Sequence, residues 1–147
     1  MIESISEKNL EAVLPLIRKY QEFYKIASIS DDRNREFFAQ FGENGDSGCL
    51  FLYRDEEGKP VAFATVYFTF VSSLPAKVGV MNDLYTLPEY RGKGIGKKLI
   101  NRCLDFALAK GAARLQWLTA EDNEVAQKLY DSLAAKKSKW LVYTYTP

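Results

Sequence analysis

The residues best suited to chemistry form a glycine-rich turn between an expected strand and an expected helix. Residues 83–96 read DLYTLPEYRGKGIG, with glycines at positions 92, 94 and 96. Glycines permit tight turns and let backbone N–H groups approach a ligand closely. The start of a helix adds unpaired N–H groups and a partial positive charge. We therefore predict an anion cradle suited to a pyrophosphate. Four cationic side chains surround it: Arg91, Lys93, Lys97 and Lys98.

Two other glycine-rich phosphate loops do not fit this turn. A dinucleotide fingerprint beginning at Gly92 requires glycine or alanine at position 97, where Lys97 stands. A P-loop ending at residues 96–97 requires glycine at 91 and serine or threonine at 98, which Arg91 and Lys98 occupy. What remains is Arg91-x-x-Gly94-x-Gly96, a pattern that an ordinary turn with three glycines also satisfies.

The chain contains no histidine, and this absence excludes several kinds of site. Ser-His-Asp and Cys-His catalytic machinery is impossible, as is a histidine-ligated metal. The two cysteines, Cys49 and Cys103, are distant in sequence and belong to no CxxC pair, so neither a zinc site nor a disulfide scaffold is indicated. Any acid or base must be Tyr, Asp, Glu, Lys, Cys or water, and we expect no metal cofactor.

Length and composition indicate one globular domain over residues 1–147. Hydrophobic residues make up 47% of the chain and charged residues 27%, an ordinary balance for such a domain. Lys and Arg number 20 against 19 Asp and Glu, which is too small an excess to favour a nucleic-acid binder. The longest apolar stretch, residues 60–74, is interrupted by polar residues, and no basic-then-apolar leader begins the chain. We expect no membrane association and a cytoplasmic location.

Apolar periodicity and turn residues predict a mixed α/β (α+β) fold, with helices flanking a central sheet. Strands are expected over six segments: 1–5, 49–54, 60–71, 78–87, 113–119 and 138–144. Helices are expected over four segments: 6–24, 30–41, 96–110 and 123–133. Ser6 is the expected N-cap of the first helix, and Pro15 is expected to bend or divide it.

The glycine turn resembles the acetyl-CoA signature of the GNAT superfamily of N-acetyltransferases. A second motif resembles the strand and helix that complete the cofactor site in that family: Trp117, Leu118, Thr119, Asn123, Ala126, Leu129 and Tyr130. The order of elements is also similar, so the resemblance covers essentially the whole chain. It implies the GNAT fold, a single domain with a sheet of six to seven strands and about four helices. It also implies acetyl-CoA as the cosubstrate and transfer to a primary amine by direct attack on the thioester.

The resemblance assigns cofactor-binding roles to individual residues. The backbone of Leu84, Tyr85 and Thr86 pairs with the pantetheine arm as an added strand would. The pyrophosphate lies on the backbone amides of Arg91, Gly92, Lys93, Gly94, Ile95, Gly96 and Lys97. Asn123 bonds to the pantetheine, with Ala126 beside it on the same helix, although an asparagine there also serves as a plain N-cap. In relatives a glycine often follows this helix. Because a left-handed cap would cost Ala134 about 1 kcal/mol, we expect the helix to end differently.

The resemblance makes Tyr130 the candidate general acid. A tyrosine hydroxyl, with an ordinary pKa of about 10, can return a proton to the departing thiolate. Spacing alone would make Tyr130 a packed core residue on the face of Leu129 and Leu133. Asp83 is the candidate base, but it can also attract a cationic substrate. If its neighbour Asn82 faces the site instead, the proton passes to water.

The acceptor is expected to be a polyamine, an amino acid or a lysine side chain. The region that holds it in the family carries acidic and aromatic residues that suit an ammonium group: Tyr20, Glu22, Phe23, Tyr24, Asp31, Asp32 and Glu36. The resemblance also allows a homodimer through the last strand, residues 139–145, where dimers of the family pair or exchange elements. Two alternatives are a non-catalytic acyl-CoA sensor and a nucleic-acid module using the lysines of the glycine turn. The near-neutral net charge of +1 disfavours the second alternative.

Overall fold

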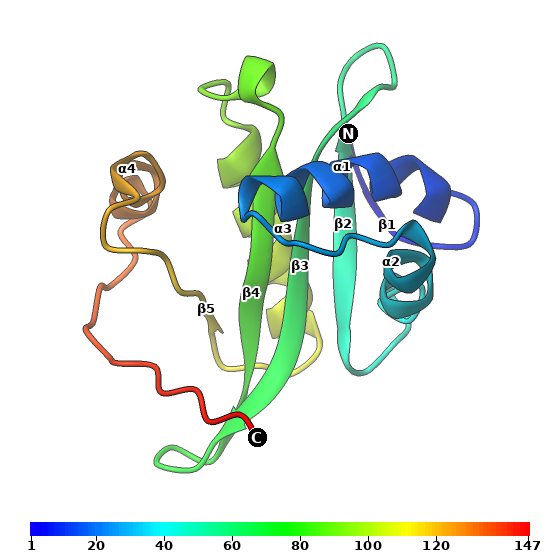
Figure 1. The fold of residues 1–147 in the computed structure, drawn as a ribbon. Coiled ribbons are helices and arrows are strands. Elements are labelled where there is room, and N and C mark those ends of the chain that lie inside the picture. The colour runs from blue at the N-terminus through cyan, green and yellow to red at the C-terminus, as the bar shows by residue number, and fades with distance from the viewer.

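Five strands form one sheet in the order β1-β2-β3-β4-β5 in the computed structural model, which describes residues 1–147 (Figure 1). The strands are β1 (Ile2–Ser4), β2 (Gly48–Arg54), β3 (Pro60–Val71), β4 (Ala76–Thr86) and β5 (Leu115–Gln116). The pairs β1–β2, β2–β3 and β3–β4 are antiparallel, and the pair β4–β5 is parallel. The predicted mixed sheet is therefore confirmed, with five strands instead of six to seven.

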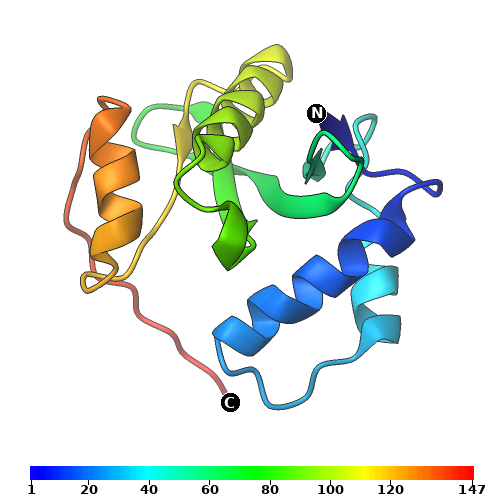
Figure 2. The ribbon, with the colours of Figure 1, turned by 90° about the horizontal axis from the view of Figure 1, so that it is seen from above.

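The helices cover the sheet on two faces. They are α1 (Leu10–Phe23), α2 (Asp31–Phe38), α3 (Ile95–Ala109) and α4 (Glu124–Ser132), with a short 3₁₀ helix η1 (Pro88–Tyr90) before α3. Helix α1 packs against β3 on one face with α2 beside it, and α3 packs against β3 and β4 on the other (Figure 2). Helix α4 stands beside the β5 edge. No helix has the length and apolar character needed to cross a membrane.

The core lies on both faces of β2 and β3. Phe51 meets Phe106 of α3, with ring centroids 5.5 Å apart, while Phe63 meets Tyr20 of α1 at 5.6 Å. Both phenylalanines are fully buried. Burying large aromatic side chains contributes a favourable free energy, so these contacts hold α1 and α3 on opposite faces of the strands that carry the site.

The predicted strand over residues 138–144 does not form. The segment pairs with no other strand, and its large apolar side chains are exposed: Trp140, Leu141, Val142 and Tyr143. The predicted strand over 113–119 pairs with β4 only at two positions, Leu115 and Gln116. Beyond Gln116 the chain leaves β4, so β5 is too short to give a further strand an edge to pair with. The aromatic and β-branched residues of 138–144 favour a strand, but no partner strand is present.

Three details of the helices bear on the prediction. Helix α1 begins after Asn9, whose Oδ1 accepts a bond from the Ser6 N–H at 2.7 Å, so Ser6 belongs to a turn before the helix. Pro15 lies within α1 without dividing it, so of the two expected effects the division is wrong. Ala134 has a φ of 59° directly after the end of α4, so the left-handed conformation judged too costly is adopted by an alanine.

Candidate active site

A break in register between β3 and β4 determines which side chains face the site. Thr65 pairs with Asp83 and Val66 pairs with Met81, which leaves Asn82 as the extra residue of a bulge. Asn82 is exposed and lines a cleft, whereas Asp83 is 7% exposed and packs beneath it. Strict alternation along a strand cannot reveal a bulge, so the sequence left the orientation of these two residues open.

The cleft forms because β4 extends beyond the end of the neighbouring strand, β5. Strand β5 ends at Gln116 after pairing with Val80, while β4 continues to Thr86 with no strand on that side. A cleft of about 530 Å³ opens between this free edge, α4 and the start of α3. All the predicted cofactor residues except Lys93 line it: Leu84, Tyr85, Thr86, Arg91, Gly92, Gly94, Ile95, Gly96, Lys97, Asn123 and Ala126.

The glycine turn presents unused donors to this cleft. The backbone N–H groups of residues 92–97 donate to no acceptor within the protein. Gly94 is the N-cap of α3 and has φ 81° and ψ 6°, a left-handed conformation that glycine adopts without cost. The buried side chain of Ile95 anchors the first turn of the helix below. Consecutive free donors at a helix N-terminus fit the diphosphate of a CoA thioester.

Arg91 is used differently from the amides beside it. Its Nε donates to the Thr86 carbonyl oxygen at 2.9 Å, and its guanidinium lies 5.6 Å from the ring centroid of Tyr85. The side chain therefore ties the turn to the end of β4. The cationic side chains expected around the cradle thus include one whose guanidinium holds the loop in place.

Helix α4 supplies the opposite wall and carries Tyr130. The Asn123 side chain accepts from the Ala126 N–H at 3.2 Å, so it caps the helix. A Cβ at Gly96 would lie only 3.1 Å from Leu129 Cδ2, which shows how closely α4 approaches the start of α3. Tyr130 lines the cleft with its ring centroid 5.2 Å from that of Trp117. Burial, followed by the nearby Tyr24, raises the pKa of Tyr130, which keeps its hydroxyl protonated at neutral pH.

Asp83 forms a polar cluster below the cleft. Thr65 Oγ1 donates to Asp83 Oδ2, and Asn82 Nδ2 donates to Asp83 Oδ1 at 3.1 Å. Burial, followed by the charge of Asp83, raises the pKa of Tyr20 above its ordinary range and that of Tyr67 to about 12. Asp83 takes part in no ion pair within the protein. Sequence reasoning missed Thr65 and Tyr67, because they belong to a neighbouring strand and no motif links them to Asp83.

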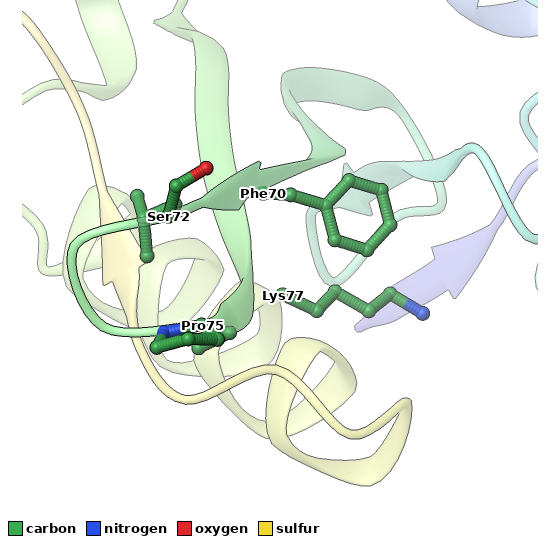
Figure 3. Close-up of a pocket in the computed structure, with 6 residues that line it drawn as sticks. Phe70, Ser72, Pro75 and Lys77 are labelled. Atoms are coloured by element: carbon green, nitrogen blue, oxygen red, sulfur yellow. The ribbon is translucent and has the colours of Figure 1, made fainter.

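A second hollow lies away from this site, at the tip of the β3–β4 hairpin. It measures about 390 Å³ and is lined by Phe70, Val71, Ser72, Pro75, Ala76 and Lys77. Figure 3 shows Phe70 and Lys77 extending side by side from the two paired strands. The Lys77 ammonium donates to the Lys110 carbonyl oxygen at 3.1 Å and lies 4.2 Å from the Phe68 ring centroid. The one cationic side chain of this hollow thus has structural contacts, and none of the predicted site residues lines the hollow.

Comparison with known proteins shows the family to which the chain belongs. The chain matches the acetyltransferase (GNAT) family model over residues 13–134, and it belongs to that family. It is similar to the thialysine N-epsilon-acetyltransferase of Bos taurus, with 32% identity over 145 residues that cover 92% of this chain and 84% of that protein. It is also similar to the uncharacterized N-acetyltransferase YhfO of Bacillus subtilis, with 33% identity over 131 residues, or 88% and 85% of the two chains.

The fold comparison leads to the same class of enzyme. A crystal structure of a probable acetyltransferase superposes with a TM-score of 0.85 at 28% identity, and the match covers 100% of this chain and 97% of the other. Together with the free edge of β4 and the free amides of the glycine turn, these matches make the protein an acetyl-CoA-dependent N-acetyltransferase.

Proposed function

We propose that the enzyme acetylates a primary amine carried by a cationic small molecule or a lysine side chain, by direct attack on the thioester. The observation that carries this proposal is the continuity of the cleft. It runs from the free amides of residues 92–97 past Tyr130 to the end of α1, where Tyr20, Phe23 and Tyr24 line it above Asp83. The bovine relative acts on thialysine, which supports an amine at the end of a lysine-like chain. Polyamines and amino acids belong to the same class of acceptor.

The residues lining the cleft divide between the two substrates. We assign the diphosphate to the free amides of residues 92–97, and the pantetheine to the backbone of residues 84–86 with Asn123 and Ala126 opposite. The Arg91 amide, which the prediction included, is not free, because it donates to the Pro88 carbonyl oxygen at 3.2 Å. Acetyl-CoA supplies the activated acetyl group when bound. Asn123 still has its amide nitrogen available, because only its oxygen is used in capping α4. An N-cap role and a pantetheine contact are therefore compatible.

Tyr130 and Asp83 are the proposed catalytic residues. Tyr130 keeps its proton near neutral pH and lies in the cleft, so it can protonate the departing sulfur. Asp83 has no cationic partner in the protein, and we assign it the substrate's positive charge. Since Asn82 lines the cleft and Asp83 lies beneath it, the amine gives its proton to water at Asn82, which passes it on to bulk solvent.

The decisive experiment is a panel of amines with acetyl-CoA in which release of free CoA thiol is followed. Spermidine, thialysine, single amino acids and a lysine-containing peptide cover the acceptor classes. We expect turnover that saturates with one of the lysine-like or polyamine acceptors. CoA binding without thiol release from any member of the panel would instead favour the non-catalytic sensor.

We also propose that a second copy of the chain covers residues 138–145, giving a homodimer. This segment leaves Trp140 84% exposed and Tyr143 89% exposed, and its four consecutive apolar residues, 140–143, have no strand to pair with. Light scattering after size exclusion should give twice the chain mass, and truncation after Ser138 should give a monomer. A monomeric full chain would contradict the proposal. The working location that we propose, the cytoplasm, is tested by cell fractionation.

A further inference from the structure

A tyrosine beside the glycine turn is tied to a distant surface turn. Tyr90 ends η1 directly before Arg91, and it lines the cleft. Its Oη donates to Asp55 Oδ2 at 2.9 Å, a contact between residues 35 positions apart. Asp55 begins the turn that joins β2 to β3 and does not line the cleft. Asp55, which lies outside the cleft, therefore binds the hydroxyl of Tyr90, which lines it.

Asp55 is itself held firmly by its own turn. Its Oδ1 accepts from the Glu57 N–H at 3.0 Å and from the Lys59 N–H at 2.9 Å, and its N–H donates to the Lys59 carbonyl oxygen at 2.9 Å. The Lys59 amide foremost, and then the Tyr90 hydroxyl, hold the pKa of Asp55 below its ordinary value. The carboxylate is therefore a fixed point from which Tyr90 can be positioned.

The glycine turn depends on such fixed points. Its amides from residue 92 to residue 97 have no partner within the protein, and no atom lies within 4 Å of a Cβ built at Gly92 or Gly94. Its conformation must be set from the flanks. On the N-terminal flank Arg91 is held through the Thr86 carbonyl oxygen and Tyr90 through Asp55, and on the other flank the buried Ile95 holds the start of α3. The Lys93 ammonium lies 5.1 Å from the Tyr90 ring centroid, which links the ring to the turn itself.

We propose that Asp55 is a positioning residue for the cofactor: acting through the Tyr90 hydroxyl, it fixes the direction of the amides of residues 92–97 and thereby strengthens CoA binding. This proposal rests on the assignment of the diphosphate to those amides. It gives the β2–β3 turn a role in an active site that it does not enter.

Two substitutions test the contact with little other change. Tyr90→Phe removes only the hydroxyl, and Asp55→Ser keeps one oxygen for the turn amides but cannot reach Tyr90. We expect each variant to raise the Kd of CoA, measured by calorimetry, and the KM of acetyl-CoA by about 3- to 10-fold, as for the loss of one hydrogen bond. The kcat at saturation and the KM of the amine should stay unchanged. Tyr53→Phe and Asp46→Ser, changes outside the cleft, are the matched controls.

The double variant distinguishes a shared contact from two separate effects. If the contact carries the effect, Tyr90→Phe and Asp55→Ser together should weaken CoA binding no more than either change alone. Multiplying effects, an unchanged Kd, or a fall in kcat alone would overturn the proposal. Gly94→Ala separates this proposal from the one beneath it. If Gly94→Ala weakens CoA binding and Tyr90→Phe does not, only the positioning role fails. If neither weakens it, the diphosphate assignment fails as well.

Discussion

Replacing Tyr130 with phenylalanine is the sharpest test of the catalytic assignment. The substitution removes one oxygen and keeps the ring that packs against Trp117 at 5.2 Å, so the wall of the cleft should persist. General acid catalysis contributes at least about 100-fold to a rate. At 1.36 kcal/mol for each factor of ten, that is a rise of about 2.7 kcal/mol in the activation barrier. We expect kcat to fall about 100-fold while the KM of acetyl-CoA changes less than about threefold.

The pH dependence of this variant provides a second readout. Burial raises the pKa of Tyr130, so the wild-type kcat should decline only in alkaline solution above about pH 10, as the hydroxyl loses its proton. The variant should lack this limb. Thiol release measured with a dye-free ultraviolet assay from pH 6 to 11 gives both the kcat and its decline in alkaline solution. A variant with more than half the wild-type kcat, or one that keeps the alkaline limb, would refute the role of Tyr130. Tyr53→Phe serves as the hydroxyl-removal control.

Three further predictions address the acceptor site and the stability of the fold. Asp83→Asn should raise the KM of the amine about tenfold or more and leave the Kd of CoA unchanged. Equal rises in the amine KM and the CoA Kd, or an amine KM no higher than that of the exposed control Asp105→Asn, would contradict the role of Asp83. Ala134→Gly should relieve the left-handed strain at φ 59° and stabilise the protein by about 0.5–1 kcal/mol in urea unfolding, whereas a loss of stability would show that the strain is absent. Burial raises the pKa of the Cys103 thiol from 9.0 to about 12. The unfolded chain therefore loses this proton at a lower pH than the folded chain, and the free energy of unfolding falls as the pH rises from 9 towards 12. Cys103→Ala should flatten the fall in unfolding free energy over that range, and an unchanged slope would count against burial as the cause.

Local chemistry made much of the molecule predictable. The β-branched and aromatic run of β3 gave its bounds, residues 60–71, because such residues favour a pleated surface. The glycine turn was predictable because left-handed backbone and a helix start impose residue types that can be read directly. The cleft residues followed from motifs, and all but Lys93 of the predicted cofactor residues line it.

The remaining features depend on relations between distant segments. The bulge at Asn82 arises from the pairing of β3 with β4, and neither strand encodes it alone. Residues 138–144 have the pattern of a strand, yet pairing requires a free edge in reach, which local pattern does not report. The Tyr90–Asp55 contact joins a turn and a loop that are unrelated by any spacing rule. Ala134 shows that a conformation with a cost of about 1 kcal/mol is still adopted when the surrounding chain requires it.

The most direct measurement is a crystal structure of the enzyme with CoA bound. The account predicts diphosphate oxygens within hydrogen-bonding distance of the backbone nitrogens between residues 92 and 97, and a pantetheine arm alongside the free edge of β4. A CoA molecule bound elsewhere on the protein, with those amides still facing solvent, would contradict it.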